Sequence, residues 1–298
     1  MEGKVPGIVL FVCLICLSAC QQPDINANAN PAAEAPQTYI ENKGSDTLVN
    51  LALAWAEEYQ QQRPEIQISV TGGGSGTGFA ALINGTINIA NASRGIKQEE
   101  IDSARALGFE PVEHIVANDA IAVIVNPSNP VSRLTLEQVS SIYKGEITNW
   151  QELGGEDRPI VKLSRETNSG THVYFLETVI RLNNKEDKSI FSADTLLLPS
   201  SEGIISEVRD NPNAIGYDGL GYVTEEVKMI ALAVSPDSEY ILPSATSVTD
   251  GSYPIARHLF MYTRNLAEGL EKEYLDWILS AQAQAIVTEL GFVPVINE

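Results

Sequence analysis

The chain contains GSDT at residues 44–47, TGGGSGTG at residues 71–78 and RETNSGT at residues 165–171. Each segment is rich in serine, threonine and glycine and leads into a stretch with helical periodicity. The first amide N–H groups of a helix have no partner within the helix, and the helix N-terminus carries partial positive charge. Three such turns that met in a cleft would surround an oxyanion with donors, so the sequence predicts an oxyanion-binding cleft.

Strand and helix patterns alternate around these turns. Strands are expected at residues 38–41, 66–70, 87–90, 120–125, 160–163, 215–217, 221–223 and 257–263. Helices are expected at residues 48–59, 79–83, 134–139 with Thr135 as N-cap, 172–182 and 270–290. The alternation predicts an α/β fold in which each turn joins a strand to a helix.

The element order further predicts two lobes joined by a hinge. The chain is expected to leave the first lobe near Asn126-Pro127 and to return along the strand at 257–263. Lobe 1 would then comprise residues 39–122 and 255–298, and lobe 2 residues 123–254. Two crossings between lobes form a hinge about which a ligand can close a cleft.

The amino terminus has the pattern of an export signal. Residues 5–19 are almost wholly apolar, which is too short for a stable membrane span but suits a signal peptide over residues 1–19. LSAC at residues 17–20 resembles a bacterial lipobox, which implies lipidation of Cys20 and a lipid-anchored protein outside the cytoplasm. An uncleaved anchor with an incidental cysteine is the alternative. Residues 20–38, rich in Asn, Ala and Pro, are expected to be a flexible tether.

Composition limits the other function classes. All three cysteines lie in the first twenty residues, so the mature chain would have no disulfide framework and no cysteine metal site. The net charge of −20 argues against nucleic acid and against an anionic membrane surface as the main partner. Surface charges are screened beyond roughly 8–10 Å at physiological salt, so local donors can still bind an anion.

Motifs for other chemistry are weak. The glycine-rich segment lacks the lysine of an ATPase loop and the spacing of a dinucleotide-binding loop, and Ser75 is outside a GxSxG motif. His114, His172 and His258 have no metal-binding spacing. We therefore expect no metal, no cofactor and no catalysis, although a phosphoester hydrolase with a dispersed triad stays open as a less favoured alternative.

Six segments resemble, in order, the signatures of phosphate-binding proteins of phosphate ABC transporters, which are type II periplasmic-binding proteins. They lie at residues 44–47, 74–78, 92–94, 147–150, 165–171 and 214–217. The resemblance covers nearly all of residues 39–295. It implies a two-lobed periplasmic-binding-protein fold, a phosphate ligand, and the permease and ATPase subunits of a phosphate ABC transporter as partners. We also expect a monomer. A receptor for sulfate, molybdate or tungstate, and a phosphate-sensing lipoprotein, are the alternatives.

The resemblance also implies a set of ligand contacts. They fall on Ser45, Asp46, Thr47, Ser75, Arg165, Ser169, Gly170 and Thr171. After the strand at 87–90, where some family members have an aspartate, this chain has Ser93 and Arg94. Arg94 would supply a second guanidinium or pair with a carboxylate that closes the lobes, and the sequence leaves both open.

A carboxylate in the site would explain selectivity. Monohydrogen phosphate can donate a proton and sulfate cannot, so a required hydrogen bond to a buried acceptor can discriminate by roughly 10⁴. Asp46 is the first candidate for this acceptor and Glu166 the second. Each feature also has a structural reading: Asp46 as a helix N-cap, the glycine run as a tight turn, and Arg165 as a surface ion-pair partner.

Overall fold

The computed structural model describes residues 38–295. The expected signal peptide, Cys20 and all of the tether except residue 38 lie outside these residues. The segment Gln37–Glu298 clusters as one compact unit. Across residues 38–295, no helix is both long enough and apolar enough to span a bilayer.

The described residues form a mixed α/β fold around a nine-stranded sheet with the order β2-β1-β3-β11-β4-β8-β6-β7, in which β9 pairs with β4. A second sheet contains β5 and β10. The strands are β1 (Tyr39–Gly44), β2 (Gln67–Thr71), β3 (Ile89–Ala92), β4 (Val112–Val125), β5 (Arg133–Thr135), β6 (Val161–Arg165), β7 (Leu196–Leu198), β8 (Ala214–Gly219), β9 (Lys228–Met229), β10 (Ala231–Ala233) and β11 (Ala256–Thr263). The expected α/β class is confirmed.

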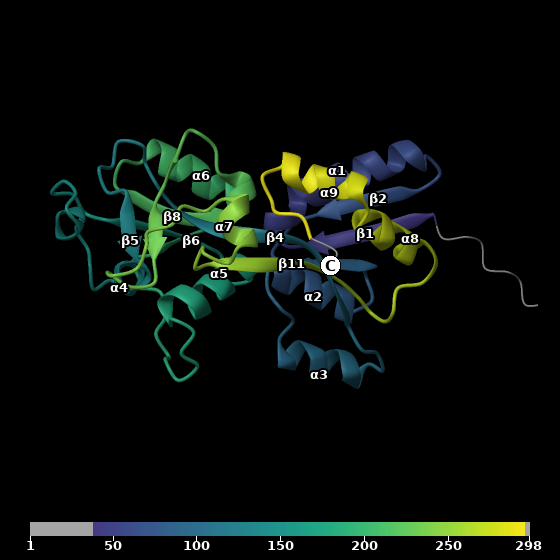
Figure 1. Cartoon of the computed structure of the whole chain (residues 1–298). Helices are drawn as coiled ribbons and strands as arrows, with labels where there is room; N and C mark the ends of the chain where they lie inside the picture. The colour runs from purple at the N-terminus through teal and green to yellow at the C-terminus, as the bar shows by residue number, and fades with distance from the viewer. Residues whose placement is uncertain (1–37, 296–298) are drawn as a thin grey trace, which may run out of the picture. The chain divides into compact units, whose positions relative to one another are not determined.

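Strand β4 belongs to both halves of this sheet. Its residues 112–120 pair antiparallel with β11, and its residues 121–125 pair with β8. The sheet therefore changes partner between Ala120 and Ile121. Figure 1 shows β4 and β11 passing between the helices α1, α2 and α9 and the helices α4, α5 and α6. The fold has two lobes, and these two strands connect them.

Helices cover both halves. They are η1 (Asp46–Leu48), α1 (Val49–Gln62), α2 (Ser75–Ile83), α3 (Gln98–Ala106), α4 (Leu136–Lys144), η2 (Trp150–Leu153), α5 (Gly170–Phe175), η3 (Leu176–Ile180), α6 (Ser201–Asp210), η4 (Leu220–Tyr222), α7 (Ala245–Thr249), α8 (Gly269–Ile278) and α9 (Ala281–Glu289). The expected apolar face of α1 is confirmed, because Leu51, Trp55 and Tyr59 are buried in one cluster. The indole N–H of Trp55 donates to the carbonyl of Ala283 at 2.8 Å, which fastens α1 to α9.

The other half has its own aromatic core. The rings of Phe175 and Tyr217 stack with centroids 3.6 Å apart, and Tyr143 meets both rings edge-on. Helix α4 begins as expected, because the Thr135 side chain accepts from the amide of Gln138. These contacts hold α4, α5 and β8 together, which fixes the position of the third glycine-rich turn relative to its sheet.

Several expected elements differ from the structure. Residues 221–223 are not a strand, because the chain turns through the 3₁₀ segment η4. The helix expected at 270–290 is two helices, since Ser280 caps the start of α9. Helices α3 and α6 were not expected. In α3 only Ala104 is buried, so the helix has almost no apolar periodicity to reveal it.

Candidate anion-binding site

Five buried hydroxyl groups lie together at the ends of the strands. We call them the hydroxyl cluster, and its members are Ser45, Thr47, Ser75, Ser93 and Thr171. Ser45 Oγ donates to Ser93 Oγ at 2.9 Å, Ser75 Oγ lies 3.4 Å from Ser93 Oγ, and Thr47 Oγ1 lies 2.9 Å from Thr171 Oγ1. Each exposes at most 1% of its surface. Each hydroxyl has one hydrogen to donate, so five of them at one place suit a ligand that accepts hydrogen bonds.

The sheet brings the first members together. Strands β1 and β3 are parallel neighbours, and Gly44 pairs with Asn91. Ser45 and Ser93 therefore leave the sheet at the same edge. Gly44 has a φ of +146°, and a Cβ there would lie 2.2 Å from the Asn91 carbonyl oxygen. Glycine is required at this position to let the two strand ends approach so closely.

The third turn packs directly on two serines of the cluster. A Cβ on Gly170 would lie 2.3 Å from Ser75 Oγ and 2.5 Å from Ser93 Oγ. Ser169 is the N-cap of α5, and its side chain accepts from the amide of Thr171 at 3.2 Å. The start of α5 therefore touches the hydroxyl cluster, and only glycine fits at the point of contact.

The second and third turns are joined by the backbone carbonyl and the side-chain amide of Asn168. The amide of Gly76 donates to the Asn168 carbonyl at 3.1 Å, and Asn168 Nδ2 donates to the Gly73 carbonyl at 2.9 Å. The three glycine-rich turns, which are up to about 120 residues apart in the sequence, meet at one place as expected.

Arg165 lies beside the cluster and is fully enclosed. Its Nη2 donates to Asp46 Oδ2 at 2.7 Å, and its Nη1 donates to Ser201 Oγ at 2.8 Å. Nη1 also lies 3.6 Å from Asp218 Oδ2. The residue is 1% exposed, so the surface ion pair that the sequence allowed is not what the structure contains. Arg165 links the first turn to the strand β8.

The carboxylates around the site differ in burial. Asp46 accepts from Arg165 and from the amide of Gly73 at 2.9 Å. Glu166 is exposed. Asp218 is completely buried, and its Oδ2 has no hydrogen-bond partner among the described residues. Burial raises the pKa of the Asp218 carboxyl, while the charge of Arg165 acts in the opposite direction.

Arg94 has a different partner. Its Nη1 and Nη2 donate to the two carboxylate oxygens of Glu100 at 2.8 and 2.6 Å, and its guanidinium carbon lies 4.7 Å from the centre of the Phe79 ring. Glu100 is on α3, in the same half of the fold as Arg94. The carboxylate that binds Arg94 is therefore local and does not come from the opposite lobe.

Arg257, like Asp218, is a residue at this site that sequence reasoning missed. It lies on β11, and its Nη2 donates to Thr171 Oγ1 at 3.1 Å and approaches Thr47 Oγ1 at 3.4 Å. Nε and Nη2 both donate to Asp119 on β4. The available signal was a charged residue inside the otherwise apolar strand pattern at 257–263, which predicts an ion pair or a functional role.

Two further side chains support the turns. Tyr222 donates from its hydroxyl to the backbone carbonyl of Asp46 at 2.6 Å. His172 stacks on Phe191, and its Nδ1 donates to the carbonyl of Arg165 at 3.0 Å. Burial lowers the pKa of His172. Within residues 38–295, no group of three or more His, Cys, Asp or Glu side chains could hold a metal ion.

Comparison with known proteins places this geometry in context. The sequence model of the family described as the PBP superfamily domain matches residues 30–282. The phosphate-binding protein PstS of Bacillus subtilis strain 168 is 32% identical over 289 residues, which are 97% of this chain and 91% of that relative. PstS of Pseudomonas aeruginosa PAO1 is 32% identical over 272 residues, covering 86% of this chain and 82% of the relative.

A solved structure has the same fold. It is that of a putative phosphate ABC transporter substrate-binding protein with bound phosphate from Clostridium perfringens, which aligns with a TM-score of 0.76 and 33% identity. The alignment covers 87% of this chain and all of that one. Both sequence and fold are therefore similar over nearly the whole described length.

Proposed function

The chain belongs to the PBP superfamily domain family, and from this membership we propose that it captures inorganic phosphate outside the cytoplasm and delivers it to an ABC transporter. Family members of this kind bind and transport a substrate and are not enzymes. The observation that carries the proposal is the convergence of four buried hydroxyls from the three turns, together with Ser93 after β3, beside Arg165 and Arg257. The relatives named for phosphate binding support the choice of ligand.

Phosphate would replace the hydroxyl–hydroxyl bonds of the cluster. Each serine or threonine hydroxyl has one hydrogen to donate, and phosphate oxygens accept from several donors at once. The hydroxyl cluster, Ser169, the Gly170 backbone and Arg165 would together surround the anion. Arg165 contributes charge-assisted hydrogen bonds, which are shorter and stronger than neutral ones. In this proposal Arg94 stays with Glu100 at the edge of the site.

Both lobes supply donors, so the bound anion would hold the lobes closed. Thr47 of the first lobe meets Thr171 of the second, and Asp46 meets Arg165. A ligand shifts a conformational equilibrium only through contacts that differ between the two states. An anion shared by both lobes makes its full set of contacts only in the closed state, which a cognate permease and ATPase would recognise.

A carboxylate acceptor would make the site selective for phosphate over sulfate. Asp46 remains the first candidate, because a carboxylate has about four acceptor positions and two of them are in use. Asp218 takes the place of the exposed Glu166 as second candidate, since its Oδ2 is buried beside Arg165. A sulfate ion would leave such an oxygen without a donor.

We also propose the remaining organisation from the sequence. Residues 39–122 and 255–298 would form lobe 1 and residues 123–254 lobe 2, in agreement with the change of strand partner on β4. A monomer would be anchored to the membrane through lipid on Cys20, with residues 20–38 as tether. Metabolic labelling with a fatty-acid probe would label the wild type and leave a Cys20→Ala variant unlabelled.

Isothermal titration calorimetry tests whether phosphate is the ligand. The segment from residue 37 onward, a compact unit, would be stripped of endogenous ligand and titrated with phosphate, sulfate and molybdate. We expect one-to-one phosphate binding and sulfate affinity lower by roughly 10⁴. The variants Asp46→Asn and Asp218→Asn identify the carboxylate that accepts the phosphate proton. Loss of that carboxylate should reduce the difference in affinity between phosphate and sulfate. Absence of phosphate binding, or preference for another oxyanion, would overturn the proposed function.

A further inference from the structure

We propose that Arg257 is a second anion-binding cation and that, through its ion pair with Asp119, it couples anion binding to movement of the hinge. This inference rests on the proposed function, because it assigns a further residue to the same anion site. It differs from the set of contacts expected from the sequence, in which Arg165 and Arg94 were the candidate guanidiniums.

The ion pair lies where the two lobes join. Arg257 on β11 and Asp119 on β4 are directly opposite each other in the antiparallel register. Asp119 lies two residues before Ile121, where β4 begins to pair with β8. Its Oδ2 accepts from Arg257 Nε and Nη2 at 3.2 and 2.9 Å, and its Oδ1 accepts from the amide of Leu220 at 3.0 Å. The pair therefore contacts both sides of the hinge.

The guanidinium of Arg257 also touches both walls of the anion site. Its Nη1 donates to the Ser93 carbonyl at 2.9 Å, and its Nη2 faces the hydroxyls of Thr47 and Thr171. By contrast, the hydrogen bonds of Arg165 go to Asp46, Ser201 and the Pro199 carbonyl. Arg257 is thus the arginine whose hydrogen bonds reach the hydroxyl cluster directly, which places a second cation at the anion site.

A purely structural ion pair would be a weaker explanation. Enclosing two charges costs solvation energy that their attraction offsets only partly, and apolar side chains of similar volume often serve as well. Asp119 and Arg257 are almost fully enclosed, with side chains 0% and 2% exposed. Arg257 directs Nη2 at the hydroxyls of Thr47 and Thr171, where it can donate a hydrogen bond to an anion. An apolar pair could not do this.

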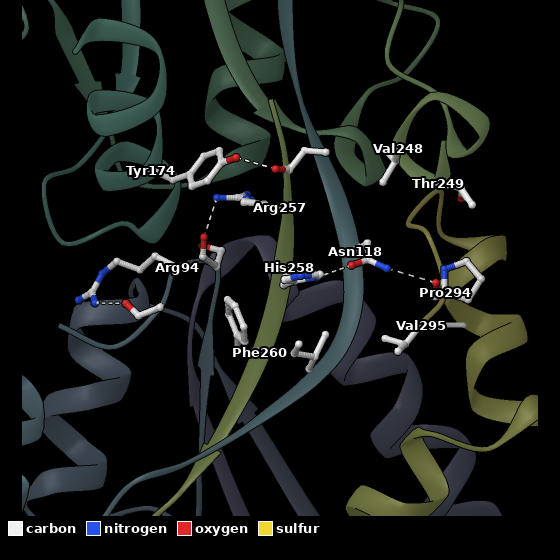
Figure 2. Close-up of a pocket in the computed structure, with 14 residues that line it drawn as sticks. Arg94, Asn118, Tyr174, Val248, Thr249, Arg257, His258, Phe260, Pro294 and Val295 are labelled. Carbon is white, nitrogen blue, oxygen red and sulfur yellow. Dashed lines mark hydrogen bonds between the residues drawn. The ribbon is translucent and has the colours of Figure 1, made fainter. Parts of the chain in front are cut away.

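A cavity borders Arg257 and also reaches Ser93 of the hydroxyl cluster. Its volume is about 620 Å³, and Arg257, Tyr174 and His258 are among the side chains that line it. Figure 2 shows Arg257 between Tyr174 and His258, with β11 and β4 running through the view. Tyr174 donates to the carbonyl of Ala256 at 2.6 Å, so α5 is attached to the hinge strand next to Arg257. A shift of Arg257 toward an anion would therefore also move β11 and α5.

The test uses a double variant that removes both charges. In Arg257→Gln with Asp119→Asn, neither partner is left as an unpaired buried charge. Titration with phosphate measures affinity, and the radius of gyration from X-ray scattering, with and without saturating phosphate, measures closure. We expect affinity lower by about 30-fold, the value of roughly one charge-assisted hydrogen bond, and a smaller closure signal. Arg264→Gln removes a charge from an exposed site just beyond β11 and should change the affinity less than twofold.

The outcomes separate this inference from the proposed function. If the wild type does not bind phosphate, the proposed function is wrong, and the inference that rests on it falls as well. If the wild type binds phosphate and closes, and the folded double variant does the same, the inference about Arg257 is wrong. The proposed function then still holds. If the double variant does not fold, Arg257→Lys decides, because it keeps the charge and loses the forked geometry. We expect at least fivefold weaker binding in that variant, and unchanged affinity would overturn the inference.

Discussion

The segments at the ends of β3 and β6 both contain Arg, Ser and Gly but make different contacts. The first is SRG at residues 93–95, and the second is RETNSG at residues 165–170. Arg94 pairs with Glu100, six residues further along the chain, whereas Arg165 pairs with Asp46, 119 residues away. A carboxylate in the following helix holds the first arginine locally. The second has Ser201 and the carboxylates of Asp46 and Asp218 around it, which keeps it at the meeting point of the turns.

The glycines of the two segments, Gly95 and Gly170, also differ in how closely other residues approach them. A Cβ on Gly95 would meet nothing within 4 Å, whereas a Cβ on Gly170 would collide with Ser75 and Ser93. Residue type at the end of a strand therefore does not establish a ligand contact. The position of the nearest carboxylate and the closeness of the opposite turn decide which segment lies against the hydroxyl cluster.

The largest effect is expected from Arg165→Ala. The variant loses charge-assisted hydrogen bonds worth about 1.5–3 kcal/mol each, so phosphate affinity should fall roughly 100-fold in titration calorimetry. The melting temperature should also fall, because buried Asp218 loses its ion-pair partner. Arg158→Ala, which removes an exposed arginine paired with Glu156, is the control and should leave affinity unchanged. Affinity within threefold of wild type in Arg165→Ala would remove Arg165 from the site.

An intermediate effect is expected from Gly170→Ala. The added methyl group would press on Ser75 Oγ and Ser93 Oγ, and overpacking of this kind costs about 1–3 kcal/mol. We expect phosphate affinity to drop about tenfold with incomplete closure in X-ray scattering. Gly95→Ala is the matched control and should bind as the wild type does. Equal behaviour of the two variants would show that the approach of α5 to the serines is not needed for binding.

The smallest effect on binding is expected from Arg94→Ala. Loss of its paired contacts with Glu100 should lower the free energy of unfolding by about 3 kcal/mol in urea titration, since the two side chains are only 7% and 16% exposed. Phosphate affinity should change less than threefold. A loss as large as that of Arg165→Ala would mean that Arg94 leaves Glu100 to bind the anion, and the contrast between the two arginines would no longer hold.

Much of the fold could be predicted from local patterns. Apolar spacing in α1, alternation in β2 and the capping residues of α4 are determined within a few residues, and each was expected at nearly its observed position. Helix α3 could not be predicted in this way, because its surface is mostly polar and exposed. The break between α8 and α9 also escaped, since apolar residues continue on both sides of Ser280.

The residues of the site also divide into those that local sequence predicts and those that it does not. The three turns were predicted because glycine, serine and threonine are restricted by local backbone geometry and capping. Arg257 was missed because its partner Asp119 is 138 residues away and no local motif joins them. Asp218 was missed for the same reason, as its role depends on the burial that β8 imposes.

Local sequence accounts for the kinds of donor that this protein presents and for the strand-to-helix turns that carry them. Both depend on backbone conformation and hydrogen bonding within a few residues. Which arginines join these donors depends on long-range contacts: Arg165 and Arg257 lie beside them, while Arg94 pairs with Glu100. A charged side chain is directed by the carboxylates and hydroxyls nearest to it in space, and the pairing of β4 with β11 and β8 sets those distances.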